Sequence, residues 1–331
     1  MSRLSLGKTR GLQQIANAKG VLTICAMDHR DSLRQVLEQS SGGTFTSQDV
    51  TDFKLDLCRA VAPFASAILL DPIYGAEQAI RAGALPGHTG LLVSMEKSGY
   101  TLEGTLRITK LLPNWGVRDI KKMGASAVKL LIYFRPDLDN VASRQIGLVA
   151  RVAEECLTED IPLLLESVTY PTVDEKEDPG EFSRKRPELV IESARRLTAL
   201  PVDVLKIEFP ADVCYEKDEP MLKKYCQELD KASRVPWVLL SAGVGFDLFR
   251  KQVEIASLAG ASGFLAGRAL WQEATQMRSR EERIAFFRTT TVQRLREIAE
   301  IASRDGRAWH ARQGVETPQL ALVSESAHHS H

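Results

Sequence analysis

Eight short apolar runs, separated by longer amphipathic segments, constrain the fold of this 331-residue chain more than any other feature. The runs span residues 21–28, 66–71, 90–96, 127–134, 162–168, 203–209, 237–243 and 262–268. Continuous apolar strands are typical of a parallel sheet that is covered on both faces. The segments between most of them, such as residues 144–159, carry apolar residues at helical spacing and predict helices.

Eight strand–helix units are the number that closes a (β/α)8 barrel. We therefore expect an α/β fold of the TIM barrel type, with N-terminal and C-terminal helical extensions. A doubly wound sheet is the alternative, but "CAMDHRDS" lacks the glycine-rich turn such a fold carries after its first strand. No interdomain linker interrupts the pattern, so we expect a single domain over residues 1–303.

The C-terminal part of the sequence gives two further expectations. A helix is predicted from about residue 280, and its Phe286 and Phe287 suit either a subunit interface or a cover for the barrel bottom. Residues 304–331 are polar and read as a disordered tail.

Charge and composition exclude several classes of protein. Lys plus Arg equals Asp plus Glu at 43 each, and a neutral chain without a basic run is a poor candidate for nucleic-acid binding. No apolar stretch is long enough to span a membrane, and the N-terminus lacks the apolar region of a secretory signal. The five cysteines are scattered and never form a C-x-x-C pair, which indicates reduced thiols, no structural zinc and a cytoplasmic location.

Polar side chains recur where the predicted strands end. In a barrel, functional residues gather at the C-terminal ends of the strands and face inward. The polar residues in phase at these ends are Asp28, Asp71, Glu96, Lys129, Glu166, Lys206 with Glu208, Ser241 and Arg268. Any one of them could be an ordinary surface or salt-bridging residue. Their recurrence on all the strands predicts an active site at the mouth of the barrel.

Two lysines stand within these apolar strands, Lys129 in "AVKLLIY" and Lys206 in "VLKIEF". If their ammonium groups approach one another in a desolvated barrel, burial and repulsion both lower the lysine pKa. A neutral amine is the nucleophile of Schiff-base chemistry with carbonyl substrates. Glu166, on the strand between them in sequence, is placed to transfer protons. The sequence therefore predicts Lys206 as a nucleophile assisted by Glu166 and Lys129.

The last two predicted strands carry a different signal. The segments 240–245, "LSAGVG", and 266–270, "AGRAL", place small residues and backbone N–H groups where barrels commonly bind phosphate. Arg268 adds a bidentate partner for an anion. The candidate phosphate-binding residues are Ser241, Gly243, Gly267 and Arg268.

Metal-assisted carbonyl chemistry is the alternative to an imine. It usually needs clustered histidines, but before the C-terminal extension the chain has only His29 and His88. We therefore expect neither a metal site nor another cofactor.

The sequence resembles the class I tagatose-1,6-bisphosphate aldolases and their relatives, the sulfofructose-phosphate aldolases. The matching stretches are "AMDHR", "FASAILLDPIYG", "MEKSGY", "GASAVKLLIYF", "IPLLLESVTY", "DVLKIEFP", "PWVLLSAGV" and "GASGFLAGRALW". Such proteins are Schiff-base aldolases on a (β/α)8 barrel that cleave a ketose 1-phosphate derivative into dihydroxyacetone phosphate and an aldehyde. The resemblance implies a phosphorylated sugar as substrate, no cofactor beyond the covalent imine, and a homo-oligomer.

The resemblance also implies roles for particular residues. Lys206 matches the imine-forming lysine, Lys129 the second active-site lysine and Glu166 the acid–base glutamate. Asp28 corresponds to an aspartate that contacts substrate hydroxyl groups. The site for the phosphate on C1 is matched by Ser241, Gly243 and Arg268.

One position departs from the family pattern and concerns the far end of the substrate. His29 stands where these aldolases usually have glutamine, and with Arg30 it lies where the distal anion is expected. "MEKSGY", with Glu96 as a substrate-binding candidate, favours the tagatose branch, whereas "GASGFLAGRALW" resembles the sulfosugar branch at least as much.

Three functions follow from this comparison. The expected one is cleavage of tagatose 1,6-bisphosphate, and of fructose 1,6-bisphosphate as a further substrate, to dihydroxyacetone phosphate and glyceraldehyde 3-phosphate. The alternative is cleavage of 6-deoxy-6-sulfofructose 1-phosphate to dihydroxyacetone phosphate and sulfolactaldehyde. A barrel that only binds phosphosugars is a lesser alternative.

Overall fold

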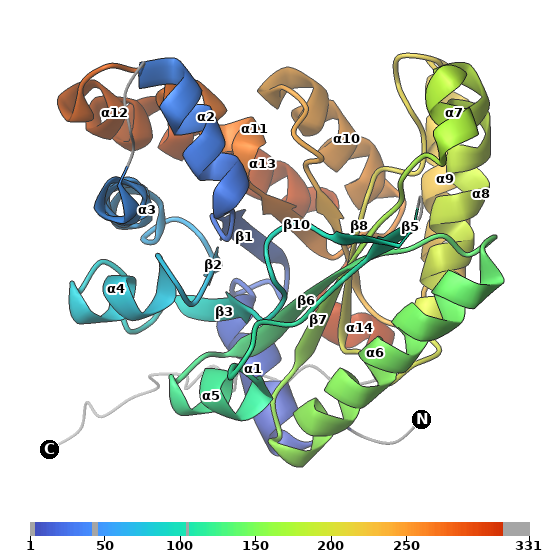
Figure 1. The fold of residues 1–331 in the computed structure, drawn as a ribbon, viewed down its shortest axis with the longest axis horizontal. Coiled ribbons are helices and arrows are strands. Elements are labelled where there is room, and N and C mark those ends of the chain that lie inside the picture. The colour runs from blue at the N-terminus through green and yellow to red at the C-terminus, as the bar shows by residue number, and fades with distance from the viewer. Residues whose placement is uncertain (1–3, 42–45, 104–105, 314–331) are drawn as a thin grey trace, which may run out of the picture.

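Eight parallel strands close into a barrel in the computed structural model, which describes residues 4–41, 46–103 and 106–313 (Figure 1). The strands are β1 (Leu22–Ala26), β2 (Ala67–Leu70), β3 (Gly90–Ser94), β6 (Ala127–Tyr133), β7 (Leu163–Val168), β8 (Val204–Ile207), β9 (Trp237–Leu240) and β10 (Gly263–Ala266). Around the barrel their order is β1-β10-β9-β8-β7-β6-β3-β2. Each strand falls within one of the predicted apolar runs, so the predicted (β/α)8 fold is confirmed.

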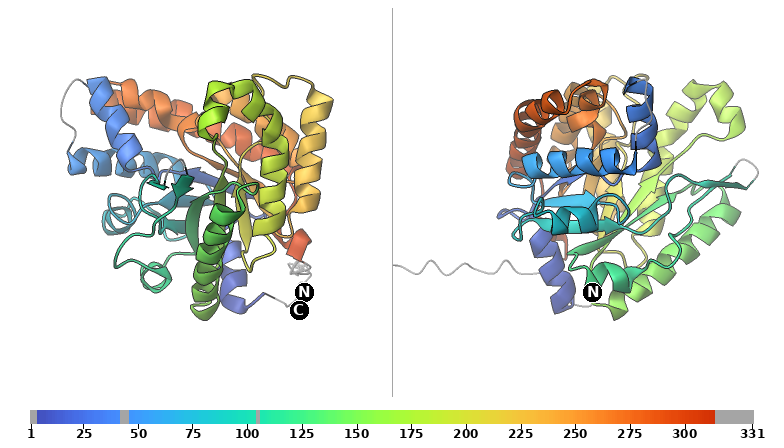
Figure 2. Two further views of the ribbon diagram at one scale, coloured as in Figure 1. Left: turned by 45° about the vertical axis from the view of Figure 1, so that its right-hand side comes forward. Right: turned by 60° about the vertical axis from the view of Figure 1, so that its left-hand side comes forward.

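Helices follow the strands and surround the barrel, as both views of Figure 2 show. They are α2 (Asp31–Ser41), α3 (Ser47–Val61), α4 (Ala76–Arg81), α5 (Val117–Lys122), α6 (Asp139–Thr158), α7 (Val173–Glu177), α8 (Pro179–Leu197), α9 (Glu219–Ala232), α10 (Phe246–Leu258), α11 (Arg268–Trp271) and the 3-10 helix η1 (Gln272–Gln276). Their apolar faces pack on the outer side chains of the strands and form the larger core. A second, smaller core fills the barrel interior.

Strand register sets the height of each inward-facing side chain. Glu166 on β7 is level with Lys206 on β8, and Leu131 on β6 is level with Glu166. Residues two apart share a face of a strand, so Val204 lies one layer below Lys206 inside the barrel. The interior is therefore apolar near the N-terminal ends of the strands and ionisable near their C-terminal ends.

The N-terminal end of the barrel is closed by α1 (Leu6–Ile15) and α14 (Trp309–Gln313), which lie at the same end of the molecule in Figure 1. Leu12, Ile15 and Trp309 pack into the interior core. Lys8 forms a buried ion pair with Asp203, with 2.8 Å between Nζ and Oδ2. These contacts seal one end of the barrel and leave the other end for the functional site.

Helix α13 (Val292–Asp305) and α14 correct the expected boundary of the C-terminal tail. The indole of Trp309 is buried, and its backbone N–H donates to the carbonyl of Gly20 at 2.9 Å. Residues 304–313 are thus part of the fold rather than of a disordered tail. The remainder of that prediction concerns residues 314–331, which lie outside the described residues.

The predicted C-terminal helix is present as α12 (Arg280–Phe286), the π-helical turn η2 (Phe287–Thr291) and α13. Phe287 is fully buried, with its ring 5.1 Å from that of Phe53, and Phe286 packs partly buried against the core. The helix contacts α3 and α10 on the side of the barrel and does not cover its bottom. Phe287 is therefore unavailable for a subunit interface, and the expected homo-oligomer stays a prediction.

One addition interrupts the strand–helix repeat, the antiparallel hairpin of β4 (Thr101–Glu103) and β5 (Leu106–Ile108). It lies between β3 and α5 in the chain, and the apolar pattern did not predict it. Within the described part of the chain, no helix is long and apolar enough to cross a membrane. The expected cytoplasmic location stays a prediction.

Candidate active site

A cavity of about 740 Å³ opens at the C-terminal ends of the barrel strands. Eleven of the thirteen site residues predicted from the sequence line it: Asp28, His29, Arg30, Glu96, Lys129, Glu166, Lys206, Ser241, Gly243, Gly267 and Arg268. The closed barrel brings together residues that are up to 240 positions apart, from Asp28 to Arg268. The sequence placed the site at the mouth of the barrel, and the structure has there a cavity lined by ionisable side chains.

Two other polar residues at predicted strand ends turn away from this cavity. Asp71 forms a buried ion pair with Lys54 on α3 and accepts the N–H of Tyr74 at 2.8 Å. Glu208 accepts the backbone N–H of Thr169 at 2.7 Å and a guanidinium N–H of Arg186 at 3.1 Å. The prediction that these two carboxylates belong to the mouth is wrong, because both stabilise the layer between strands and helices.

Lys129 lies at the centre of the site, with its side chain only 1% exposed. Its Nζ contacts three carboxylates, at 2.8 Å from Asp28, 2.6 Å from Glu96 and 2.9 Å from Glu166. Burial alone would lower the pKa of Lys129, but these carboxylates outweigh burial and raise it well above its ordinary value. The predicted lowering of the pKa is wrong for Lys129, which is a permanent cation.

Glu166 bridges the two lysines. Its Oε1 lies 2.8 Å from Nζ of Lys206, and its Oε2 lies 2.9 Å from Nζ of Lys129. Burial alone would raise the pKa of Glu166, but the two ammonium groups lower it. The same balance between burial and the lysine charges holds the pKa of Asp28 well below its usual range. Both carboxylates are therefore ionised, and Glu166 is within reach of a proton on Lys206.

The loops after β9 and β10 form the side of the cavity expected to bind phosphate. Gly243 has φ of 77°, and a Cβ at this position would lie 2.9 Å from the guanidinium carbon of Arg268. Ala242 beside it also has a left-handed φ of 47°, an uncommon conformation that concentrates at functional sites. Ser241 accepts the N–H of Gly267 at 3.4 Å and connects the two loops.

Arg268 forms no ion pair with a carboxylate among the residues that the structure describes. Its guanidinium therefore keeps its donors for a ligand, next to a loop whose left-handed φ at position 243 favours glycine. A guanidinium beside a glycine-containing loop is suited to a phosphate group.

Arg30 and His29 line another side of the cavity. Arg30 is 5% exposed and donates from NH2 to the backbone carbonyl of Glu96 at 2.6 Å, while its Nε and NH1 are buried and have no hydrogen-bond partner among the described residues. The ring of His29 meets that of Trp271 edge-on at 5.3 Å, and its buried Nδ1 lies 3.9 Å from Oδ1 of Asp28 and forms no hydrogen bond within the described part of the chain. Burial lowers the pKa of His29 to about 4, although the Asp28 carboxylate opposes the shift. The side chain of His29 is therefore neutral at pH 7.

Two cavity-lining tyrosines escaped the sequence analysis. Tyr133 ends β6 on the same face as Lys129, and Tyr100 precedes the β4–β5 hairpin; their rings are 4.9 Å apart. Side chains alternate along a strand, so Tyr133, four residues after Lys129, faces the same side. The same alternation could therefore have predicted Tyr133 as a residue of the site. Tyr100 follows a strand in a segment without periodicity and gave no such signal.

In the described ranges, no group of three or more His, Cys, Asp and Glu side chains is arranged to hold a metal ion. The carboxylates that do gather, Asp28, Glu96 and Glu166, converge on the ammonium group of Lys129.

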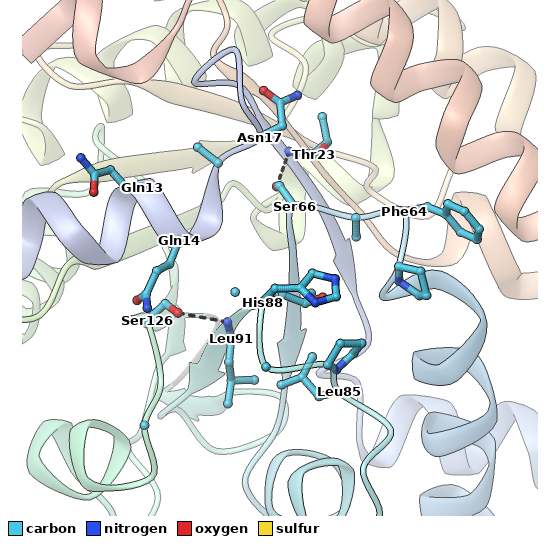
Figure 3. A pocket seen from close by; sticks show the side chains of 18 of the residues that line it. Gln13, Gln14, Asn17, Thr23, Phe64, Ser66, Leu85, His88, Leu91 and Ser126 are labelled. Carbon is cyan, nitrogen blue, oxygen red and sulfur yellow. Dashed lines mark hydrogen bonds between the residues drawn. The ribbon is translucent and has the colours of Figure 1, made fainter. Parts of the chain in front are cut away.

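A second cavity, of about 690 Å³, lies at the opposite end of the first strands (Figure 3). Its buried hydroxyl groups are already in use. Ser66 donates to the carbonyl of Ile15 at 2.7 Å and accepts the N–H of Thr23 at 2.9 Å, and Ser126 accepts the N–H of Leu91 at 3.2 Å. None of the predicted site residues lines this cavity, so the ionisable groups are concentrated in the first one.

The mouth of this barrel combines two lysines, three carboxylates and an arginine without a carboxylate partner among the described residues, an arrangement typical of TIM barrel enzymes. A family model for "DeoC/LacD family aldolase" matches residues 22–273. The chain belongs to the DeoC/LacD aldolase family, and it is an aldolase.

Individual relatives agree with this assignment. The tagatose 1,6-diphosphate aldolase of Listeria monocytogenes serotype 4b (strain F2365) is 33% identical over 293 residues, which cover 84% of this chain and 85% of the relative. The tagatose 1,6-diphosphate aldolase of Staphylococcus aureus (strain Newman) is 31% identical over 327 residues, covering 92% and 98%.

Solved structures of similar fold are more distant in sequence. An archaeal fructose 1,6-bisphosphate aldolase has a TM-score of 0.60 at 20% identity, covering 89% of this chain and 99% of its own. Fructose-bisphosphate aldolase from Plasmodium falciparum has a TM-score of 0.70 at 14% identity, covering 92% and 98%. At these identities the two structures show a shared fold.

Proposed function

We propose that the chain is a Schiff-base aldolase that cleaves a ketose 1,6-bisphosphate to dihydroxyacetone phosphate and glyceraldehyde 3-phosphate. Tagatose 1,6-bisphosphate is the first substrate, because the curated relatives carry that name. The observation that supports the chemistry best is the 2.8 Å contact between Nζ of Lys206 and the ionised carboxylate of Glu166 in the open cavity. It joins a nucleophile to a base, as covalent catalysis by lysine requires.

The first half of the reaction forms the imine. Lys206 transfers a proton to Glu166, and the resulting amine attacks the C2 carbonyl of the open-chain ketose. The proton then moves from Glu166 to the hydroxyl group of the carbinolamine, which leaves as water. Lys129 remains protonated throughout, because its carboxylate neighbours raise its pKa, and its ammonium group contacts Glu166 at 2.9 Å. Its role is therefore electrostatic, and differs from that of a second neutral amine.

The second half breaks the C3–C4 bond. A carboxylate, Asp28 or Glu166, takes the proton of the C4 hydroxyl group, and the electron pair of the bond moves into the protonated imine. Glyceraldehyde 3-phosphate leaves, the protonated carboxyl group returns its proton to C3 of the enamine, and water hydrolyses the resulting imine to dihydroxyacetone phosphate and free Lys206. Both carboxylates suit the base role, because the neighbouring lysines keep their pKa values low enough for them to be ionised.

The two ends of the substrate would occupy different sides of the cavity. The C1 phosphate fits the loops after β9 and β10, where Arg268 lies beside Gly243. The distal anion fits Arg30, whose Nε and NH1 are buried and have no partner among the described residues. Unpaired buried donors carry a desolvation penalty of about 1–3 kcal/mol each, which an anion in contact with them would relieve.

Cleavage of 6-deoxy-6-sulfofructose 1-phosphate is the second candidate, because the free donors of Arg30 suit a sulfonate as well as a phosphate. Its products would be dihydroxyacetone phosphate and sulfolactaldehyde. A barrel that binds phosphosugars without cleaving them is disfavoured by membership of an aldolase family.

Competition between the two sugars tests the substrate. The enzyme is incubated with equal concentrations of tagatose 1,6-bisphosphate and 6-deoxy-6-sulfofructose 1-phosphate, and the aldehyde products are quantified by mass spectrometry. We expect the bisphosphate to be cleaved with the higher kcat/KM. A preference for the sulfosugar of about tenfold, or 1.4 kcal/mol, would reverse the assignment of the distal anion.

A further inference from the structure

Tyr133 is a cavity residue to which neither half of the proposed reaction assigns a role. It ends β6, and the alternation of that strand places its side chain on the face of Lys129 and Leu131. Its register partner on β7 is Val168, two residues beyond Glu166, and both line the same cavity. No hydrogen bond within the described part of the chain engages its hydroxyl group. The phenol therefore has a donor free for a ligand.

The ring of Tyr133 is fixed by a tyrosine cluster, which we define as Tyr100, Tyr133 and Tyr170 around Arg107. Its ring meets those of Tyr100 and Tyr170 edge-on, at 4.9 Å and 6.4 Å. The guanidinium carbon of Arg107 lies 4.4 Å, 5.6 Å and 5.0 Å from the ring centres of Tyr100, Tyr133 and Tyr170. Such cation–π contacts hold rings in place without using the hydroxyl groups.

The order of strands sets which part of the substrate reaches Tyr133. In the closed barrel, β10 lies opposite β6 and β9 lies opposite β3. With the C1 phosphate at Arg268 and C2 on Lys206, the substrate extends past β6 before its distal anion reaches Arg30, whose NH2 donates to the carbonyl of Glu96 after β3 at 2.6 Å. Its C4 oxygen, which becomes the aldehyde oxygen, then comes to the side where Tyr133 lies.

We propose that Tyr133 is a further catalytic residue whose hydroxyl group donates a hydrogen bond to the C4 oxygen while the C3–C4 bond breaks. The role rests on the proposed function. The C4 hydroxyl proton goes to the carboxylate base, the electron pair of the bond enters the imine, and Tyr133 keeps its own proton. The donor stabilises the negative charge that develops on oxygen as its proton leaves.

The protonation state of Tyr133 fits a donor. Burial raises the pKa of Tyr133 above its ordinary value of 10.0, so the phenol is protonated at neutral pH. It is therefore a hydrogen-bond donor to the substrate and is not the base that removes the C4 proton.

The test compares two reactions of Tyr133→Phe. Cleavage of tagatose 1,6-bisphosphate involves C4, whereas formation of an imine with dihydroxyacetone phosphate does not. We expect kcat for cleavage to fall by about 100-fold, the effect of removing one donor to a developing oxyanion. Borohydride trapping of dihydroxyacetone phosphate on Lys206, measured by intact mass, should match the wild type.

The matched control is Tyr170→Phe, which removes a hydroxyl group from the same cluster on a residue that is buried outside the cavity. Tyr170 accepts the backbone N–H of Arg107 at 3.3 Å, so this variant reports loss of cluster structure alone. A Tyr133→Phe enzyme with wild-type kcat would overturn the inference. Equal losses of trapping and cleavage would overturn it as well, since they would mean a structural role. Absence of trapping in the wild type would instead contradict the proposed function.

Discussion

The charges of individual residues explain how this site functions at neutral pH. Lys129 contacts the carboxylates of Asp28, Glu96 and Glu166, and Glu166 also contacts Lys206. Transfer of a proton from Lys206 to Glu166 moves charge within the cluster and leaves its total unchanged. Removing the charge of Lys129 would leave the carboxylates of Asp28 and Glu96 without this ion-pair partner, at a cost of about 3–5 kcal/mol. The stability of the site therefore depends on the same residues that the proposed reaction uses.

The lowered pKa of His29 predicts how the stability of the folded protein depends on pH. Its pKa is about 4 in the folded protein, below the ordinary value of 6.5. As the pH falls from 6.5 toward 4, the unfolded chain binds a proton that the folded chain does not, so the free energy of unfolding decreases. We expect this loss to be about 2 kcal/mol, allowing for the partial exposure of the ring. Urea unfolding at a series of pH values measures it.

The control for this prediction is His29→Gln, which places the residue usual in related aldolases at this position. The variant removes the titrating group, so its stability should depend less steeply on pH across the same window. Identical pH profiles for the two proteins would contradict a lowered pKa of His29.

At the scale of elements, loops rather than strands shape the side of the cavity that we propose binds the C1 phosphate. The loop after β9 places Gly243 at φ of 77° directly against Arg268, and its neighbour Ala242 is also left-handed. A side chain at position 243 would displace the guanidinium or strain the loop. The loop conformation and the position of Arg268 therefore depend on each other.

Gly243→Ala tests this dependence. We expect KM for tagatose 1,6-bisphosphate to rise by tenfold or more, because loss of about 1.4 kcal/mol of phosphate binding has that effect. Reaction of Lys206 with unphosphorylated dihydroxyacetone should be unchanged, since that ligand does not need the loop. If the variant loses reactivity toward both ligands in equal measure, Gly243 shapes the whole site and not the phosphate subsite.

Across the whole molecule, the sequence predicted the features that follow from burial and alternation. Strands covered on both faces must be apolar, so all the barrel strands were recognisable, and inward phase singled out Lys129, Glu166 and Lys206. Alternation does not predict the direction of a side chain just beyond the end of a strand. Asp71 and Glu208 follow the last residues of β2 and β8, and the sequence therefore misplaced them. The sequence pattern could not predict the raised pKa of Lys129 either, because this pKa depends on carboxylates that β1, β3 and β7 bring together only after folding.

The closed end of the barrel is expected to contribute mainly to stability, and the open end carries the proposed active site. Trp309 is 3% exposed and packs with Leu12 and Ile15 at the closed end, far along the strands from Lys206. We expect Trp309→Ala to lower the free energy of unfolding by about 3 kcal/mol, as for other large-to-small substitutions in cores. Its kcat should stay near that of the wild type under folding conditions. A large fall in kcat without a change in urea midpoint would contradict this division.

The central claim is that Lys206 forms an imine, and reductive trapping tests it most directly. The protein is treated with dihydroxyacetone phosphate and borohydride, digested, and mapped by mass spectrometry, with Lys206→Met as the control. We predict one reduced adduct, on the peptide that contains Lys206, and no adduct in the variant. Ligand binding without an adduct on any lysine would contradict Schiff-base catalysis, and an adduct on Lys129 would contradict the assignment of the nucleophile.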